Sequence, residues 1–412
     1  MRCLRRTPVA FAFVLALSAA PRAARAELPT LERTVQLARA RAIAVIDAEG
    51  ELGVAGAQMA GARQSALGNP YADIQVDKGL KTGQELQALA YTYFPVDIAG
   101  QRGARIEEAD KLITWRKLGL VDARAGATGE AITAYGALVV GASRVAEATR
   151  GEELAREEAK YFAGRFEAKD TTVYEKALSE AEVARWVQQR AEAELAEGNA
   201  RARFALVTGT GQVDAPPKGV ALLPPALRAT WDDGFIARVV DRAPLLARAG
   251  AERAYWDASA ERYKTERVPP VSFEIIGGRG AAGEARVGGG LVLTLPVTRR
   301  YQGEIARAEH GRAQVERAVP LYRNMVMARI RAARDALATT TRAVTDLDKT
   351  GMPAFETAAS AAQEGYKAGK IELSRVLLAR RDLATARSRR LDLLDAAWRA
   401  YADLATFSGD LP

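Results

Sequence analysis

The sequence predicts a mainly α-helical chain with a small β part, in which a long helical hairpin occurs twice. Three observations support this fold class. Short motifs recur about 200 residues apart, apolar residues recur every seven positions through long stretches, and segments of alternating apolar and polar residues come in pairs. Heptad spacing is typical of long packed helices, and alternation is typical of strands.

Composition narrows the class of protein. The 412 residues include one Cys and one His, which excludes a disulfide scaffold and a zinc site built from these two ligands. Charged residues make up 27% and hydrophobic residues 48%, which is typical neither of a disordered chain nor of a protein with many membrane helices. We expect no cofactor.

Residues 1–26 have the features of a secretory signal peptide. Three arginines precede an apolar run over 9–20, and Ala24-Arg25-Ala26 supplies a small-x-small cleavage site. Cleavage there removes five arginines and no acids, which lowers the formal charge from +8 to +3, so nucleic acid is not an expected partner. Later apolar runs are shorter than the ~20 residues of a membrane helix. An exported chain of this kind is either soluble or spans a membrane as a β-barrel.

The repeat divides the chain. We predict a first half over 27–211, a Pro- and Gly-rich linker over 212–225 and a second half over 226–412, each half in the order helix, two strands, long helical hairpin. The matching segments are 69–71 with 269–271, 94–96 with 295–297, 165–169 with 365–369, and 207–209 with 407–409.

The strands are predicted as two pairs, at 72–79 with 85–94 and at 271–277 with 287–295. Four strands are too few for a membrane barrel, which starts at ~8 strands, and open strand edges are not tolerated in lipid. Two interpretations remain open. Either the strands form small soluble hairpins, or several chains pool them, and three chains would supply twelve.

The helices are predicted to be very long. Residues 100–164 contain no proline and would form a rod of ~95 Å as one helix. Because the apolar seams are narrow and Ala-rich, such helices need neighbours, and we expect an oligomeric tube. The seam residues are Ile106, Ile113, Leu120, Ala127 and Ala134 in the first half, and Ile330, Leu337, Val344, Leu377, Ala384, Leu391 and Trp398 in the second.

Over nearly all of 27–412, the chain resembles the TolC-like outer-membrane efflux factors. The resemblance rests on the two hairpin tips, 165–175 and 365–377, and on the strand-to-helix junctions, 93–102 and 295–305. The second half is closest to the heavy-metal branch that works with resistance-nodulation-division pumps. The resemblance implies a homotrimer with a periplasmic α-barrel and a twelve-stranded outer-membrane β-barrel. It implies a passive export duct, with metal cations among the expected cargoes, and with a periplasmic adaptor, an inner-membrane pump and outer-membrane lipid as partners.

The resemblance also implies that an adaptor docks at the hairpin tips. The candidate docking residues are Phe166, Ala168, Lys169, Tyr366, Ala368 and Gly369. Lys169 departs from the family pattern because a Gly is usual there, so we expect the first turn or its docking to differ. Given the resemblance, we interpret Tyr91, Tyr93 and Phe94 as an interfacial aromatic girdle, with ordinary hairpin packing as the alternative.

Closure of the duct at rest is expected at the same tips. Glu175 and its repeat mate Arg375 carry opposite charges, and we hypothesise that they help to hold the closed tips together. Glu372 and Lys370 are weaker candidates for lining the mouth. The alternative is that these are solvated surface charges. Since an exposed ion pair contributes ~0–1 kcal/mol, several pairs would have to act together.

Other signals carry no function in this interpretation. Gly278–Gly283 matches a dinucleotide fingerprint, but no helix follows it, so we expect a hairpin loop. His310 and the cluster Arg387, Arg389 and Arg390 are interpreted as solvated surface residues. No catalytic constellation stands out, so we expect no enzyme. The alternative function is a periplasmic coiled-coil tether that never enters lipid.

Overall fold

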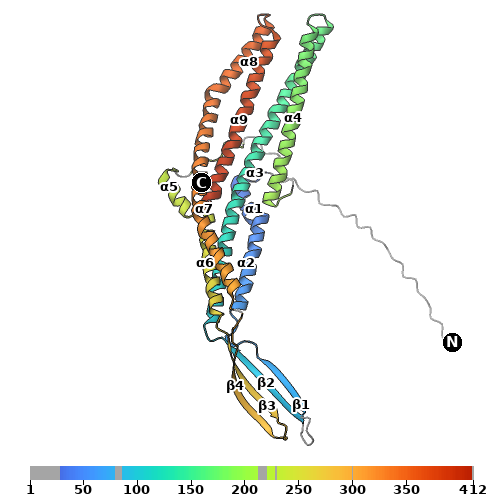
Figure 1. Cartoon of the computed structure of the whole chain (residues 1–412). Helices are drawn as coiled ribbons and strands as arrows, with labels where there is room; N and C mark the ends of the chain where they lie inside the picture. Colours follow the sequence, from blue (N-terminus) through green and yellow to red (C-terminus); the bar gives the residue numbers. More distant parts are fainter. Residues whose placement is uncertain (1–27, 79–85, 212–219, 228–229, 299, 411–412) are drawn as a thin grey trace, which may run out of the picture.

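The computed structural model describes residues 28–78, 86–211, 220–227, 230–298 and 300–410. The predicted signal peptide, part of the predicted linker and the turn between the first two strands lie outside these residues. The described chain is elongated, with a sheet at one end and the tips of two helical hairpins at the other (Figure 1).

The first half contains four helices and two strands among its described residues. They are α1 (Leu31–Arg41), α2 (Ile43–Ala62), β1 (Tyr71–Lys78), β2 (Leu86–Val96), α3 (Gln101–Glu167) and α4 (Val173–Thr208). Helices α3 and α4 form the first hairpin. Helix α3 runs for 67 residues, as its proline-free sequence predicts.

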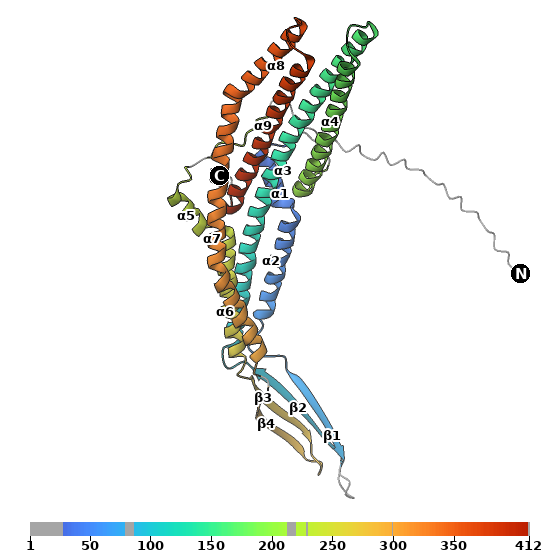
Figure 2. The same cartoon turned by 45° about the horizontal axis from the view of Figure 1, so that its top comes forward.

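The second half repeats this order with one interruption. Its elements are α5 (Asp233–Asp241), α6 (Pro244–Thr265), β3 (Val271–Arg279), β4 (Ala285–Leu293), α7 (Gln302–Asp346), the π-helix η1 (Leu347–Gly351), α8 (Met352–Lys367) and α9 (Leu373–Ser408). Helices α7 to α9 form the second hairpin, which bends between α7 and α8 (Figures 1 and 2). The predicted fold class, mainly α with four strands, is confirmed.

The main core lies at mid-height, where α1, α3, α4, α7 and α9 meet. Its largest fully buried side chains include Phe204, Ile132, Leu138 and Leu394. Gly136 allows α3 to approach α9 closely, because a Cβ there would lie 2.4 Å from Cγ of Trp398. The predicted seams contribute Leu120, Ala127, Ala134, Ile330, Leu337, Val344, Leu391 and Trp398 to this core.

Part of the predicted linker packs on the same core. Val220, Leu222 and Leu223 are partly buried against it, and the Leu222 carbonyl accepts a hydrogen bond of 2.8 Å from Nε1 of Trp398. The described linker residues therefore pack against the helices of the main core. The division into 27–211, 212–225 and 226–412 stays a prediction.

The sheet is a single layer of four antiparallel strands in the order β1-β2-β3-β4. The two predicted pairs therefore join edge to edge through β2 and β3. β3 extends to Arg279 and β4 begins at Ala285, each two residues beyond the prediction, because the turn between them is tighter than its Gly-rich sequence suggests. None of the described helices is long and apolar enough to cross a membrane.

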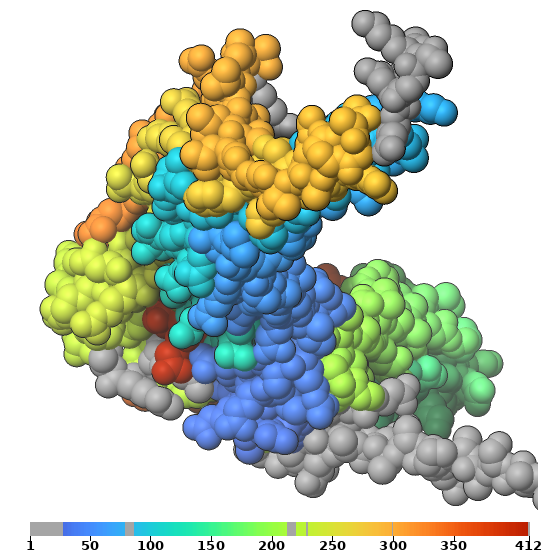
Figure 3. Space-filling view, turned by 90° about the horizontal axis from the view of Figure 1, so that it is seen from below, coloured from blue at the N-terminus to red at the C-terminus, as the bar shows by residue number. Residues whose placement is uncertain are grey.

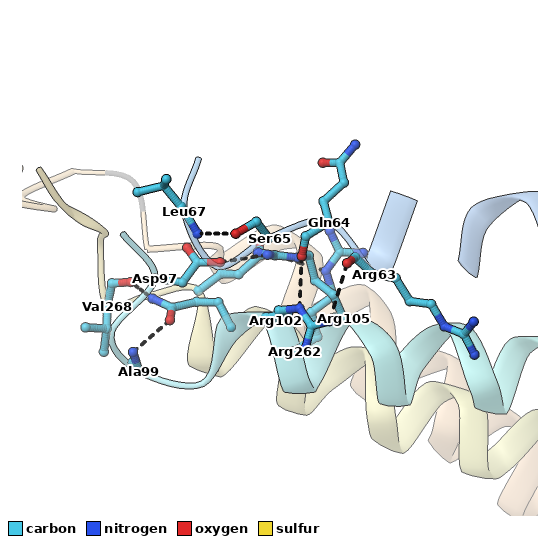
Figure 4. A network of polar contacts seen from close by, with 12 residues as sticks. Arg63, Gln64, Ser65, Leu67, Asp97, Ala99, Arg102, Arg105, Arg262 and Val268 are labelled. Atoms are coloured by element: carbon cyan, nitrogen blue, oxygen red, sulfur yellow. Dashed lines mark hydrogen bonds and ion pairs between the residues drawn. The ribbon is translucent and has the colours of Figure 1, made fainter. Parts of the chain in front are cut away.

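Buried polar contacts fix the sheet to the helices. Gln101, which is 2% exposed, accepts from the Ala99 amide and donates to the Val268 carbonyl, both at 2.7 Å. The Arg105 guanidinium pairs with Asp97 at 2.7 Å (Figure 4). These bonds tie the junction from β2 to α3 and the junction from α6 to β3 to the start of α3, so they fix the base of the sheet to the helices.

Candidate functional site

One face of the sheet is apolar and exposed. Strand side chains alternate between faces, and the strand register places one set of residues together. This apolar face includes Val287, which is 88% exposed, and Ile74, which is 71% exposed. Its other large members are Val76, Leu86, Phe94, Phe273, Ile275, Leu291 and Leu293. A contiguous exposed apolar surface of this kind marks contact with lipid or with another protein.

The opposite face is polar. It carries Asp73, Gln75 and Glu274 together with Tyr91 and Tyr93. The Tyr93 ring stacks on that of Tyr71, with 4.7 Å between the ring centroids. A sheet that is apolar on one face and polar on the other is the pattern of a membrane strand with one side toward lipid and one toward water.

The predicted aromatic girdle is therefore wrong for two of its three residues. Tyr91 and Tyr93 lie on the polar face, and only Phe94 lies on the apolar face. The physical reason is the period-2 alternation of the strand, which sends Tyr93 and Phe94 to opposite sides. Tyr93 packs within the sheet, on Tyr71, as the alternative interpretation had it.

Both outer strands of the sheet have an open edge. Within the described residues, β1 pairs only with β2, and β4 pairs only with β3. Viewed from the strand end, the chain forms an open curved wall (Figure 3). An edge strand presents unpaired N–H and C=O groups, which cannot be left unsatisfied in lipid.

The two hairpin tips share one turn geometry. In the first, the Lys169 amide donates to the Phe166 carbonyl at 3.0 Å, and the Asp170 amide donates to the Arg165 carbonyl at 2.8 Å. The second tip repeats these bonds from Gly369 and Lys370, at 2.9 and 2.8 Å. This pair of bonds defines a Schellman motif, whose C′ residue adopts the left-handed conformation. Accordingly, φ is +61° at Lys169 and +69° at Gly369.

The docking candidates all lie at these two turns. Ala168 and Ala368 are the C-caps of α3 and α8, Lys169 and Gly369 follow them, and Phe166 and Tyr366 precede them. Lys169 therefore occupies a conformation that favours glycine, as the departure from the family pattern suggested. No adaptor contact is tested by the geometry, so the docking assignment stays a prediction.

The tips of the two hairpins contact each other within the chain. The Arg165 guanidinium donates to the Tyr366 hydroxyl at 3.2 Å, and the Tyr366 ring lies 6.1 Å from that of Phe162. A small separate core, which we call the tip core, lies beneath this contact and consists of Phe162, Leu373, Val376 and Leu377. Phe162 and Arg165 were not predicted as contact residues. The heptad pattern could not identify them, because it gives the apolar face of each helix but not the contacts between the two hairpins.

The gate candidates do not meet in the structure. Glu175 forms a capping box at the start of α4: its amide donates to Oγ1 of Thr172 at 3.1 Å, and its carboxylate accepts from the Thr171 hydroxyl. Arg375, Lys370 and Glu372 are exposed. The ion pairs of the described residues include none between Glu175 and Arg375. The closing role of these residues stays a prediction.

Ion pairs join the two hairpins further from the tips. Arg144 of α3 pairs with Asp392 of α9 at 2.7 Å, Glu158 of α3 pairs with Arg380, and these side chains border a groove of about 820 Å³ between α3, α4 and α9. Burial raises the pKa of Glu158, and the nearby Arg380 only partly offsets this. The hairpins are therefore held together by polar contacts as well as by the two cores.

Two arginines of the basic cluster on α9 also form ion pairs with other helices. The prediction that this cluster is a solvated face is therefore wrong for these two residues. Arg387 pairs with Glu147 of α3 at 3.1 Å and with Glu356 of α8 at 3.0 Å. Arg390 binds both carboxylate oxygens of Asp348 in η1, one of them at 2.9 Å. Only Arg389 stays exposed. The prediction failed because the partners come from other helices.

The structure also places the other signals that the sequence analysis set aside. Gly278–Gly283 lies at the turn from β3 to β4, not before a helix. His310 is exposed on α7. In the part of the chain that the structure describes, no group of three or more His, Cys, Asp or Glu side chains is placed to hold a metal ion.

The fold, an amphipathic sheet joined to two long helical hairpins, is that of solved outer-membrane channels. The chain has the fold of two such channels: MtrE of Neisseria gonorrhoeae in its open state (TM-score 0.75, 17% identity, covering 93% of this chain and 89% of that one) and CmeC of Campylobacter jejuni (TM-score 0.74, 15% identity, 92% and 86%).

One relative is similar to the chain in sequence. The chain is 26% identical over 337 residues to the cobalt-zinc-cadmium resistance protein CzcC of Cupriavidus metallidurans, covering 76% of this chain and 75% of that protein. No family model matches the chain. These relatives agree with the resemblance given by the sequence: the two solved structures are outer-membrane channels, and CzcC is by its name a cobalt-zinc-cadmium resistance protein.

Proposed function

We propose that the chain is one subunit of an outer-membrane export channel that acts as a passive duct in a tripartite efflux system. The observation that carries the proposal is the sheet, which combines an exposed apolar face with two open edges. A soluble tether would gain nothing from exposing Val287, Ile74 and Leu293 to water, since each exposed apolar side chain forgoes about 1.5–3 kcal/mol of burial.

Association of three chains resolves both features of the sheet. Twelve strands are enough to close a membrane barrel, whereas four are not. Closure satisfies the open edges of β1 and β4, places the apolar face toward lipid and leaves the polar face toward a water-filled interior. The hairpins of three chains then form the wall of a periplasmic tube. Such a tube lowers no chemical barrier, and the energy for export comes from a pump in the inner membrane.

The adaptor would dock at the hairpin tips, at the far end from the sheet. Phe166, Lys169 and Tyr366 lie at or beside the turns, with Ala168, Ala368 and Gly369 forming the backbone of the same surface. For the cargo we infer metal cations. The support for this is the similarity to CzcC, whose name describes resistance to cobalt, zinc and cadmium.

The oligomeric state tests the proposal directly. We expect the mature protein to fractionate with the outer membrane, to run as a heat-modifiable trimer and to form ion-conducting pores in planar bilayers. A protein that is monomeric and soluble in buffer without detergent, and that forms no pores, would refute the duct and support the tether instead.

The closing role of Glu175 needs a control, because Glu175 also caps α4. If its charge helps to close the tips, Glu175→Arg should raise single-channel conductance. Thr172→Ala removes the cap partner at a cost of about 0.5–2 kcal/mol and leaves the charge in place. Equal conductance changes in the two variants would show that the cap matters and that the charge does not.

A further inference from the structure

Four exposed arginines surround the junction between the sheet and the helices. Arg63 follows the end of α2, Arg102 lies in the first turn of α3, Arg267 follows the end of α6, and Arg300 precedes α7. We call these four residues the basic collar. Each lies at the sheet-facing end of a different helix, so the collar forms one level of the molecule.

Among the described residues, no ion pair joins a carboxylate to an arginine of the basic collar. Three of the four guanidinium groups donate to backbone carbonyls instead: Arg102 to Gln64 at 3.0 Å, Arg267 to Arg300 at 3.3 Å, and Arg300 to Pro296 at 3.1 Å. Figure 4 shows the first of these contacts. These bonds hold the side chains at the junction without cancelling their charge.

Two acids near the collar in the chain pair with other arginines, and a third, Glu304, lies half-buried in the first turn of α7. Asp97 pairs with Arg105 at 2.7 Å, and Glu266 accepts from Arg262 at 3.0 Å. Both carboxylates are largely buried, with side chains 18% and 16% exposed. With four exposed arginines against Glu304, the net formal charge at this level is positive.

Two helix N-termini add to this positive field. Helices α3 and α7 both begin at the junction, and Arg102 and Arg300 lie at or beside their first turns. A helix N-terminus carries partial positive charge and favours a nearby anion. The first turn of α7 already holds Glu304, whereas the first turn of α3 holds no acid. The arrangement is therefore suited to a negatively charged partner.

Apolar residues at the same level indicate where that partner lies. Leu295 and Val297 are 77% and 74% exposed, and Ile98, Leu67 and Val268 are also exposed. They continue the apolar face of the sheet down to the collar. In a membrane strand protein, the level at which apolar exposure gives way to charge is the level of the lipid headgroups.

We propose that the basic collar binds the phosphate groups of anionic phospholipids at the periplasmic surface of the outer membrane. The inference rests on the proposed function, since it needs the sheet to lie in lipid. Guanidinium forks match phosphate oxygens in a bidentate geometry, and a basic residue near an anionic surface favours binding. The lipid would thereby set the depth at which the sheet ends and the helices begin.

The test compares lipid selectivity in reconstituted trimers. The collar variant carries Arg63→Gln, Arg102→Gln, Arg267→Gln and Arg300→Gln. A control variant carries the same charge change at exposed helical arginines away from the junction, Arg203, Arg342, Arg381 and Arg389. A third variant carries lysine at the four collar positions and keeps the charge. Spin-labelled phosphatidylglycerol and phosphatidylcholine report the relative association constant of each lipid with the protein.

We expect the wild type and the control variant to prefer phosphatidylglycerol about fivefold at low salt. The collar variant should lose the preference, and the lysine variant should keep most of it. An equal preference in the collar variant and the wild type would overturn the inference. Inorganic phosphate that displaces the labelled lipid at an equal phosphate concentration would also overturn it, by showing a site for a free anion. A wild type that inserts into neither lipid would instead refute the proposed function.

Discussion

Replacing Lys169 with glycine should stabilise the tip of the first hairpin. Lys169 is the C′ residue of a Schellman turn with φ of +61°, and its repeat mate Gly369 has φ of +69° in the same turn. In the left-handed region the Cβ of an L-residue crowds the following carbonyl, whereas glycine has no Cβ. The two tips thus offer the same backbone with and without this strain.

The size of the effect follows from two opposing costs. The left-handed conformation costs a non-glycine residue about 1–2 kcal/mol. Glycine, however, loses more backbone entropy on folding than lysine does, and this lowers the stability of the folded state by about 0.5–1 kcal/mol. The net stabilisation in Lys169→Gly should therefore be about 0.5–1 kcal/mol. The reverse change, Gly369→Lys, should destabilise the second tip by a similar amount.

Hydrogen exchange at the turn measures this directly. The Asp170 amide donates to the Arg165 carbonyl at 2.8 Å, so it exchanges only when the turn opens. A gain of 0.5–1 kcal/mol should slow its exchange about two- to fivefold in Lys169→Gly. The Lys370 amide, in the same bond of the second tip, should be unchanged and serves as the internal control.

A matched variant separates backbone strain from loss of the lysine side chain. Lys367→Gly removes a lysine from the last turn of α8, where the backbone is helical, and should destabilise that turn by about 1 kcal/mol. If Lys169→Gly speeds exchange as Lys367→Gly does, the strain argument fails, and the Lys169 side chain must be stabilising its turn.

Three further changes test the sheet, the tip core and the hairpin contact. Val287→Lys on the apolar face should lower the yield of inserted trimer on a gel, at a cost of about 2–4 kcal/mol, whereas Gln75→Lys on the polar face should be tolerated. Phe162→Ala should destabilise the tip core by about 3–5 kcal/mol in denaturant unfolding, and the exposed Tyr161→Ala by much less. The raised pKa of Glu158 means that the folded protein holds its proton more tightly, so its contribution is complete below pH 4.5 and declines as pH rises through the raised value. Glu158→Gln should flatten this part of the pH dependence of the unfolding free energy, and an unchanged slope would contradict it.

The elements of this fold were predictable because they depend on local pattern. Heptad spacing and the absence of proline predicted α3, and period-2 alternation predicted all four strands to within two residues. The pairing of β2 with β3 was not predictable, since it joins segments about 180 residues apart that no turn connects. The pairing depends on how the two halves pack, which is a property of the whole chain.

The side-chain contacts between the hairpins show the same limit more strongly. Arg387 and Arg390 are three residues apart on one helix face, which in isolation indicates a solvated stripe. In the structure their carboxylate partners are Glu147, Asp348 and Glu356, on three other elements. The sequence of one charged helix face does not predict which other helix packs against that face. Glu175 differs because its contact is local. The sequence Thr172-Val173-Tyr174-Glu175 has the pattern of a capping box, and the structure forms that box.

The repeat places glycine at equivalent positions of the two hairpins, but the contacts around the two glycines differ. Gly151 lies in α3 against α4, where a Cβ would lie 2.3 Å from the ring of Trp186, so glycine there supports packing between helices. Gly351, 200 residues later, lies in η1, where a Cβ would meet Cδ1 of Leu347 at 2.6 Å, the end of a flexible side chain that can move aside. Because α3 continues straight through this level and the second hairpin bends there, the two hairpins differ in shape although their tips close with the same turn. A duplicated sequence therefore predicts the backbone of its second copy well only where both copies use each residue for the same contact.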